Sequence, residues 1–147
     1  MTLSNSLLQK IFSHCERLYP SEACGLLIGK NYPTELILCK NVQDNLHGKN
    51  PIWFSRTSRN AYLIDPQELL TIQKKCCREG KRIQMIFHSH TDGGAYFSKE
   101  DQKQALIDGE PTWPDVHYLV VSVMHGKAKE ARLFRWRRLA FAAVEFL

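Results

Sequence analysis

The side chains best suited to chemistry lie between residues 87 and 101. His88 and His90 stand two positions apart at the end of an apolar run, which is typical of a buried β-strand. Because successive strand side chains point to opposite faces, both imidazole rings should lie on one face, where they could share a metal ion. Two histidines and one carboxylate leave a coordination position open for water, as in catalytic zinc sites. The pair therefore indicates metal-assisted hydrolysis if a carboxylate ligand is close.

Two aspartates could supply this third ligand. Asp101 reaches the histidines if the chain between them doubles back, and Gly93-Gly94 allow such a turn because glycine accepts backbone angles that other residues avoid. Asp92 is the alternative, in an H-x-H-x-D pattern like that of metallo-β-lactamase-like hydrolases, which continue with a histidine where this chain has Gly93. Ser98 and Asp101 also fit a structural role, because S-x-x-D at a helix start is close to a capping box.

A framework of alternating helices and strands must position these side chains. Helical spacing of apolar residues and helix-capping residues predict helices over 6–18, 65–79 and 98–107, with a last helical turn through Leu139, Ala142, Ala143 and Phe146. β-rich runs bounded by turn residues predict strands at 23–29, 34–41, 60–64, 82–88, 116–124 and 130–136. The first two strands should pair as a hairpin, and the polar segment 43–59 should form a long loop. This order of elements predicts an α/β fold.

Length and composition limit the remaining possibilities. The 147 residues, 44% apolar and 24% charged, predict one domain spanning 1–147 with its own core, and exclude a disordered chain. No apolar run approaches the ~18 residues that would span a bilayer, and the first residues carry no export signal. The five cysteines form no C-x-x-C pair and are expected to be reduced thiols. We therefore expect a cytoplasmic protein with no membrane partner.

Positive charge is concentrated near the end of the chain. The formal net charge is +5, and six basic residues accompany one acidic residue between positions 127 and 138. Such a segment favours an acidic partner, either a protein or a nucleic acid. Arginines interleaved with Phe134 and Trp136 make nucleic-acid binding an alternative function, but that function leaves the metal motif without explanation.

Two segments together resemble one enzyme family. His88-x-His90, seven residues, Ser98, two residues and Asp101 reproduce the H-x-H-x7-S-x2-D signature of the JAMM (MPN+) metalloproteases. Residues 20–29 read Pro-Ser-Glu-Ala-Cys-Gly-Leu-Leu-Ile-Gly, which is similar to the segment that carries the catalytic glutamate of that family. The order of predicted elements matches as well, and the resemblance is closest to the short, stand-alone prokaryotic members.

The resemblance implies a fold and a set of residue roles. The fold would be an MPN-type, cytidine-deaminase-like mixed sheet flanked by helices. His88, His90 and Asp101 would bind Zn²⁺, Glu22 would take a proton from the attacking water, and Ser98 would stabilise the oxyanion. Many relatives carry proline after the second histidine, where this chain has Thr91, a change that removes no ligand.

The resemblance also implies a class of substrate. Members of the family hydrolyse amide or isopeptide bonds at the C-terminal tails of ubiquitin-like proteins, and the short prokaryotic ones are linked to sulfur-carrier proteins that end in Gly-Gly. Such a tail could thread a narrow groove as an added strand, and we expect 43–59 and 93–97 to form the walls of that groove. A catalytically silent MPN-like scaffold is the remaining alternative, although such relatives usually lose the metal ligands.

Overall fold

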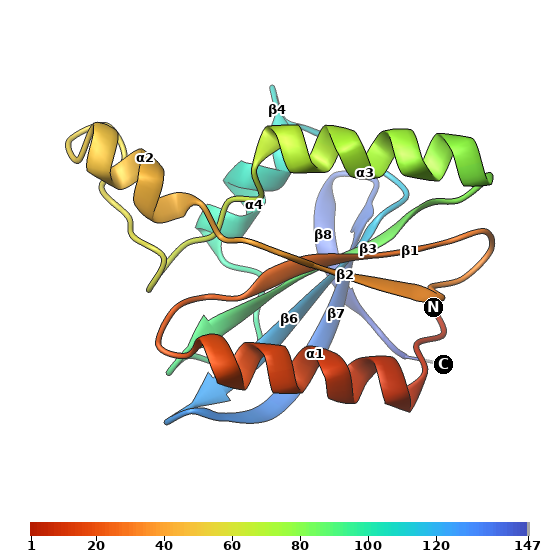
Figure 1. Ribbon diagram of the computed structural model, residues 1–147, viewed down its shortest axis with the longest axis horizontal. Helices are drawn as coiled ribbons and strands as arrows, with labels where there is room; N and C mark the ends of the chain where they lie inside the picture. The colour runs from red at the N-terminus through yellow and green to blue at the C-terminus, as the bar shows by residue number, and fades with distance from the viewer. Residues whose placement is uncertain (147) are drawn as a thin grey trace.

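The computed structural model describes residues 1–146 and shows a mixed sheet between two helical layers (Figure 1). The six strands, in sheet order, are β2 (Glu35–Cys39), β1 (Cys24–Gly29), β3 (Arg82–Thr91), β6 (His117–Met124), β7 (Lys127–Arg137) and β8 (Ala140–Val144). Neighbouring strands are antiparallel except β3 and β6, which are parallel. One apolar core joins the sheet to α1 (Asn5–Leu18), and a second joins its other face to α3 (Pro66–Glu79) and α4 (Lys99–Ala105). The predicted α/β sheet flanked by helices is confirmed.

The two long helices begin and end where the sequence predicts. The side chain of Ser4 accepts a hydrogen bond from the backbone of α1, and the side chain of Asp65 does the same for α3. Gly80 ends α3 with a φ of 65°, a left-handed conformation that glycine adopts without strain. Within residues 1–146, no helix combines the length and the apolar character that crossing a bilayer requires.

The β-hairpins also agree with the sequence pattern. β1 and β2 pair antiparallel, with Cys24 opposite Cys39, as expected for strands joined by a short turn. β6 and β7 are joined by His125 and Gly126, which both have positive φ, as two-residue hairpin turns require. The five cysteines are free, and only Cys77 is exposed.

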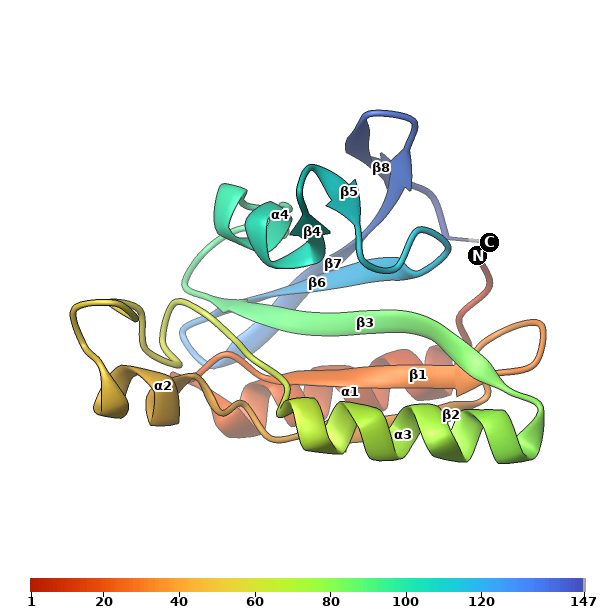
Figure 2. The ribbon, with the colours of Figure 1, turned by 90° about the horizontal axis from the view of Figure 1, so that it is seen from above.

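The parallel pairing of β3 with β6 explains how the site residues meet. Parallel neighbours cannot be joined by a tight turn, so the chain must travel back along the sheet between them. It does so through α4 and the small hairpin of β4 (Leu106–Ile107) and β5 (Glu110–Pro111). Figure 2 shows β3 lying between α3 and α4. The start of α4 is thereby placed near the end of β3, which carries both histidines.

Two predictions for the segment 43–64 were wrong. The expected loop begins with a helix, α2 (Gln43–Lys49), which starts where Asn41 Oδ1 accepts the backbone N–H of Gln43 at 3.0 Å. The expected strand over 60–64 is an irregular segment with a single bridge, between Asn41 and Ile64. Hydrogen bonds from distant side chains replace the strand ladder here, so local β-propensity does not decide the structure.

The end of the chain also differs from the sequence prediction. The expected helical turn through Leu139, Ala142, Ala143 and Phe146 is instead strand β8, paired antiparallel with β7. Phe141 of β8 packs against Phe97, with ring centroids 4.7 Å apart. This pairing extends the sheet and buries aromatic surface. The stabilisation from both exceeds what a short helical turn at this position would provide. The third helix is also shorter than predicted, because the chain turns into β4 after Ala105.

Gly25 should tolerate no side chain, because it lies between two packed strands. A Cβ atom there would lie 2.5 Å from the carbonyl oxygen of Ile37 and would overlap the ring of Phe87. Gly25→Ala should therefore destabilise the fold by about 1–3 kcal/mol, measured by urea denaturation. Gly48→Ala is the matched control, because a Cβ at that helical position meets nothing within 4 Å. Equal denaturation midpoints for the two variants would contradict this account of the β1–β3 contact.

Candidate metal centre

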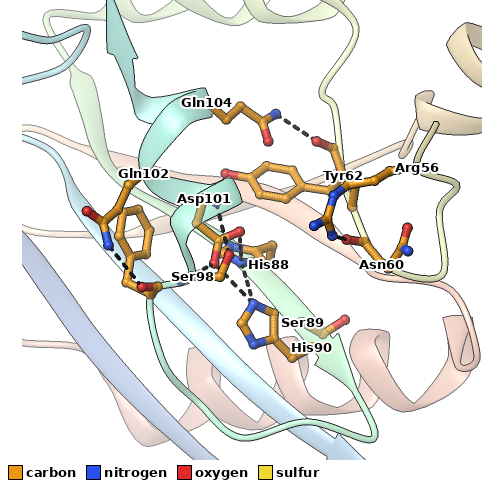
Figure 3. Close-up of polar contacts among 12 residues, drawn as sticks. Arg56, Asn60, Tyr62, His88, Ser89, His90, Ser98, Asp101, Gln102 and Gln104 are labelled. Atoms are coloured by element: carbon orange, nitrogen blue, oxygen red, sulfur yellow. Dashed lines mark hydrogen bonds and ion pairs between the residues drawn. The ribbon is translucent and has the colours of Figure 1, made fainter. Parts of the chain in front are cut away.

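Three buried side chains converge at the end of β3. The Nε2 atoms of His88 and His90 lie 3.3 Å apart, so both rings occupy one face of the strand, as the spacing predicts. The carboxylate of Asp101 faces both rings, with Oδ1 3.1 Å from His88 Nε2 and Oδ2 3.1 Å from His90 Nε2 (Figure 3). Three ligand atoms of these types, this close together and buried, could hold a metal ion.

Asp101 also caps the helix that carries it. Its Oδ2 accepts the backbone N–H of Ser98 at 2.9 Å, and the Ser98 hydroxyl oxygen accepts the backbone N–H of Asp101 at 3.0 Å. This reciprocal pair is a capping box, so the structural interpretation of S-x-x-D is correct. It is compatible with the metal interpretation, because the same carboxylate faces the histidines. The cap restricts the rotation of the Asp101 side chain and aims it at the end of β3.

Each histidine ring is oriented by a different contact. His90 Nδ1 lies 2.9 Å from the carbonyl oxygen of Gly94, which can only accept, so Nδ1 carries a hydrogen and Nε2 is the nitrogen that faces Asp101. The His88 ring stacks on Tyr62, with ring centroids 4.4 Å apart and planes 19° apart. His88 Nδ1 is buried without a hydrogen-bond partner among residues 1–146. Stacking on Tyr62 therefore holds the face of the His88 ring, while its Nε2 atom faces Asp101.

Asp92, the alternative third ligand, lies away from the two rings. It accepts a hydrogen bond from the Tyr19 hydroxyl at 2.5 Å and from the backbone N–H of His125 at 2.7 Å. These bonds tie the end of α1 and the β6–β7 turn to the loop that follows β3. The structure thus brings Asp101, and not Asp92, to the histidine pair.

Burial and hydrogen bonding shift the pKa values in the cluster. Burial lowers the pKa of His88 below its ordinary value. Burial acts in the same direction on His90, but the bond to Asp101 outweighs it and leaves the pKa of His90 raised. For Asp101, burial raises the pKa, and the hydrogen bonds to both histidines more than reverse this effect, so the carboxyl stays ionised. The cluster thus presents an ionised carboxylate between two imidazoles.

Glu22 lies at the entrance to β1 and lines the same cavity as His90, Ser98 and Asp101. Its backbone is fixed on both sides, because its N–H donates to the carbonyl oxygen of Ser58 at 2.6 Å and its carbonyl accepts from Asn41 Nδ2 at 2.9 Å. Its side chain is buried, and burial raises the pKa of Glu22 to about 8. A carboxyl group with a pKa near neutrality can exchange protons at working pH.

Asn41 connects the segments around the site, and the sequence analysis missed it. Its amide nitrogen donates to the carbonyl oxygens of Glu22, at 2.9 Å, and Ala61, at 3.0 Å. Its amide oxygen accepts the backbone N–H groups of Gln43, at 3.0 Å, and Leu63, at 3.1 Å. One side chain thus joins the base of α2, the Glu22 backbone and the segment that carries Tyr62. A single asparagine between a strand and a polar segment gives no sequence signal for this role.

Tyr62 was missed for a different reason. It falls in the stretch predicted as a strand, and its aromatic ring is consistent with ordinary core packing. Its position is set from α4, where Gln104 Nε2 donates to the Tyr62 carbonyl oxygen at 2.7 Å (Figure 3). Only the fold shows that the ring covers His88.

A cavity of about 340 Å³ opens beside the three converging side chains. The segment after α2 contributes Arg56, Arg59 and Asn60, and the loop after β3 contributes Gly93 and Tyr96. The two segments that the sequence analysis expected to form walls therefore do line one cavity. The basic side chains of β7 are not among the residues that line it.

Comparisons with known proteins agree with this geometry. Residues 4–139 match the family described as prokaryotic homologs of the JAB domain. The chain is 28% identical over 135 residues to the CysO-cysteine peptidase of Mycobacterium tuberculosis, covering 92% of this chain and 82% of that protein. It is 34% identical over 99 residues to a probable TtuB-protein conjugate cleaving protease of Thermus thermophilus, covering 67% of this chain and 59% of that protein.

Solved structures show the same fold. A protein from Desulfitobacterium hafniense superimposes with a TM-score of 0.74 at 24% identity, covering 99% of this chain and 90% of that one. A JAB1/MPN domain protein from Archaeoglobus fulgidus superimposes with a TM-score of 0.58 at 18% identity, covering 99% and 96%. The predicted MPN-type fold is therefore confirmed. With the family match extending over nearly all of its length, the chain belongs to the prokaryotic homologues of the JAB domain.

Proposed function

We propose that the protein is a zinc-dependent peptidase of the JAMM type that hydrolyses an amide bond at the C-terminal tail of a ubiquitin-like or sulfur-carrier protein. The observation that carries this proposal is the convergence of His88, His90 and Asp101. The two Nε2 atoms lie 3.3 Å apart, and each lies 3.1 Å from a different oxygen of the Asp101 carboxylate. Glu22 and Ser98, the two residues to which the family resemblance gives catalytic roles, line or border the same small cavity.

The donor set of the cluster fits a zinc ion. Two imidazole nitrogens and one carboxylate are ligands that zinc takes in catalytic sites. One ligand atom from each of the three residues lies within 4.8 Å of the others, so the three side chains could share one ion. The carboxylate of Asp101 is already ionised, as a metal ligand must be, and His90 Nε2 would coordinate after it releases any proton that it shares with Asp101. When bound, zinc would polarise the scissile carbonyl and acidify the attacking water.

The protein's own residues would carry the proton and stabilise charge. Glu22 would accept a proton from the attacking water and pass it to the leaving amine, which suits a carboxyl group with a raised pKa. The oxygen of the Ser98 hydroxyl accepts the helix N–H, so its own hydrogen remains available. That hydrogen would be donated to the oxyanion of the tetrahedral intermediate. Asn41 and Ser58 would keep the Glu22 backbone in place.

The substrate class is supported by the relatives and by the size of the cavity. Two similar proteins are named for cleaving CysO-cysteine and TtuB-protein conjugates. A cavity of about 340 Å³ is at the small end of ligand sites, which span roughly 300–1,000 Å³. A tail of two glycines suits such a narrow site, because it has no side chains to clash. A silent scaffold is disfavoured, because the cluster of potential ligands is complete.

Zinc content should distinguish the two aspartates. The purified protein should hold about one zinc per chain, and His88→Ala or Asp101→Ala should lose most of it, because two ligands hold zinc poorly. Asp92→Ala is the matched control and should keep its zinc, since Asp92 is bonded to Tyr19 and His125 instead. Elemental analysis after dialysis measures the content. A full zinc equivalent in Asp101→Ala would show that the ligand set is wrong.

Replacing Glu22 should separate proton transfer from metal binding. Glu22→Gln keeps the size of the side chain but cannot accept a proton, so hydrolysis should fall by on the order of 10²–10⁴ while zinc content stays normal. The assay follows, by mass spectrometry, release of a residue attached after the Gly-Gly of a sulfur-carrier protein. Glu110→Gln, at an exposed position on β5, is the control. Equal turnover by Glu22→Gln and wild type would remove Glu22 from the mechanism.

The buried carboxyl of Glu22 should also make the metal-free protein less stable as pH rises. Its pKa is raised from 4.5 to about 8, so between these values the folded chain keeps a proton that the unfolded chain has released. The free energy of unfolding should then fall by on the order of 1 kcal/mol per pH unit in this window. Glu22→Gln lacks this titration and should gain stability relative to wild type from pH 5 to pH 8. Urea denaturation in the presence of a chelator measures the difference, and a constant difference across this range is the contrary result.

A further inference from the structure

The cavity beside the metal centre carries positive charge that the proposed hydrolysis does not use. Its lining includes three cationic and three acidic side chains, namely Arg56, Arg59, Lys99, Glu22, Glu100 and Asp101. With all six groups ionised these charges cancel, so a divalent ion held by the cluster would leave the cavity with an excess of at least two positive charges. Neither a scissile amide nor a Gly-Gly tail carries a charge. The cavity is therefore suited to a substrate that brings an anion close to the reacting bond.

The three cations differ in how they are already paired. Arg56 is held within the protein, because its Nε lies 3.6 Å from a carboxylate oxygen of Glu100 and its Nη1 donates to the carbonyl oxygen of Asn60 at 3.1 Å (Figure 3). Arg59 and Lys99 have no carboxylate within ion-pair distance among residues 1–146. Both line the cavity with an exposed side chain, so both are free to bind a ligand.

The position of Arg59 is set from the metal-binding strand itself. The hydroxyl of Thr91 donates to the carbonyl oxygen of Arg59 at 2.8 Å, and Thr91 directly follows His90. Thr91 is also the position at which this chain departs from the proline carried by many relatives of the JAMM family. A proline has no hydroxyl and could not make this bond. The threonine at this position thus gives a hydrogen bond that joins the Arg59 backbone to the end of β3.

We propose that Arg59, assisted by Lys99, binds the free α-carboxylate of an amino acid that leaves from the end of the substrate tail. This inference rests on the proposed function and specifies its leaving group. When an amino acid is joined to the tail through its amine, its carboxylate lies only two bonds from the scissile nitrogen. An isopeptide bond to a lysine side chain places no carboxylate there. A guanidinium can bind a carboxylate through two hydrogen bonds. Arg59 thereby favours removal of a single terminal residue over cleavage of a protein conjugate.

A pair of matched substrates tests this directly. One is a short synthetic peptide that ends in Gly-Gly-Ala with a free carboxylate, and the other is the same peptide with a C-terminal carboxamide. The zinc-loaded wild type should release alanine from the first with a kcat/KM about 10- to 100-fold higher than it releases alaninamide from the second, because a hydrogen bond to a charged group is lost. Arg59→Gln should lower kcat/KM for the carboxylate peptide alone, so that this preference collapses. Arg78→Gln, near the end of α3, is the control and should keep the preference.

Binding without turnover provides a second readout. Zinc-loaded Glu22→Gln should bind the carboxylate peptide more tightly than the carboxamide peptide in calorimetry, and adding Arg59→Gln should remove the difference. If Arg59→Gln fails to fold, Thr91→Val removes only the anchoring hydroxyl and should weaken the same preference.

The outcomes separate this inference from the proposed function. Equal cleavage of both peptides by wild type would overturn the role of Arg59 and leave the peptidase proposal standing. An equal loss on both peptides in Arg59→Gln would also overturn it, because the arginine would then hold the tail or the carrier. Cleavage of neither peptide, nor of a complete sulfur-carrier protein extended by one residue, would overturn the proposed function itself.

Discussion

The carboxylate of Asp101 is shared between a helix N-terminus and two histidine rings, and the geometry of the site depends on this sharing. One oxygen atom accepts the backbone N–H of Ser98 while facing His90, and the other faces His88. A buried carboxylate is costly unless it is fully hydrogen-bonded, so α4 and the end of β3 must keep a fixed distance. The same Asp101 carboxylate therefore caps α4 and completes the histidine cluster, so the position of α4 relative to β3 is fixed by one group.

That constraint is met because the sheet is mixed. β3 and β6 run parallel, so the chain between them crosses the α3 face of the sheet and begins α4 beside the strand end that carries the histidines. An antiparallel neighbour could have followed β3 through a tight turn and left no room for this helix. The opposite wall comes from the segment after α2, which Asn41 and Ser58 tie to the backbone of Glu22. Three distant parts of the chain thus meet around one cavity.

Hydrogen bonds to backbone groups, more than ion pairs, hold the residues around the site. Asn41 satisfies four backbone groups with one amide, and Ser58 is held by both carboxylate oxygens of Asp44. Charged side chains are left for the cavity, where Arg59 and Lys99 have no carboxylate partner within residues 1–146. The two cationic side chains are therefore exposed to a ligand, while hydrogen bonds to backbone groups hold the segments that carry them.

The sequence alone determined the features that depend on local periodicity and on motif spacing. Strand alternation placed His88 and His90 on one face, S-x-x-D placed a capping box at Ser98 and Asp101, and Asp65 with Gly80 bounded α3. The tertiary structure alone decided the features that depend on contacts between distant segments. These include the helix α2, the irregular segment that brings Tyr62 onto His88, the strand β8 and the burial that raises the pKa of Glu22. The physical reason is that each of them is stabilised by partners many residues away, such as Asn41 for Leu63 or Phe97 for Phe141, which leave no pattern in the local sequence.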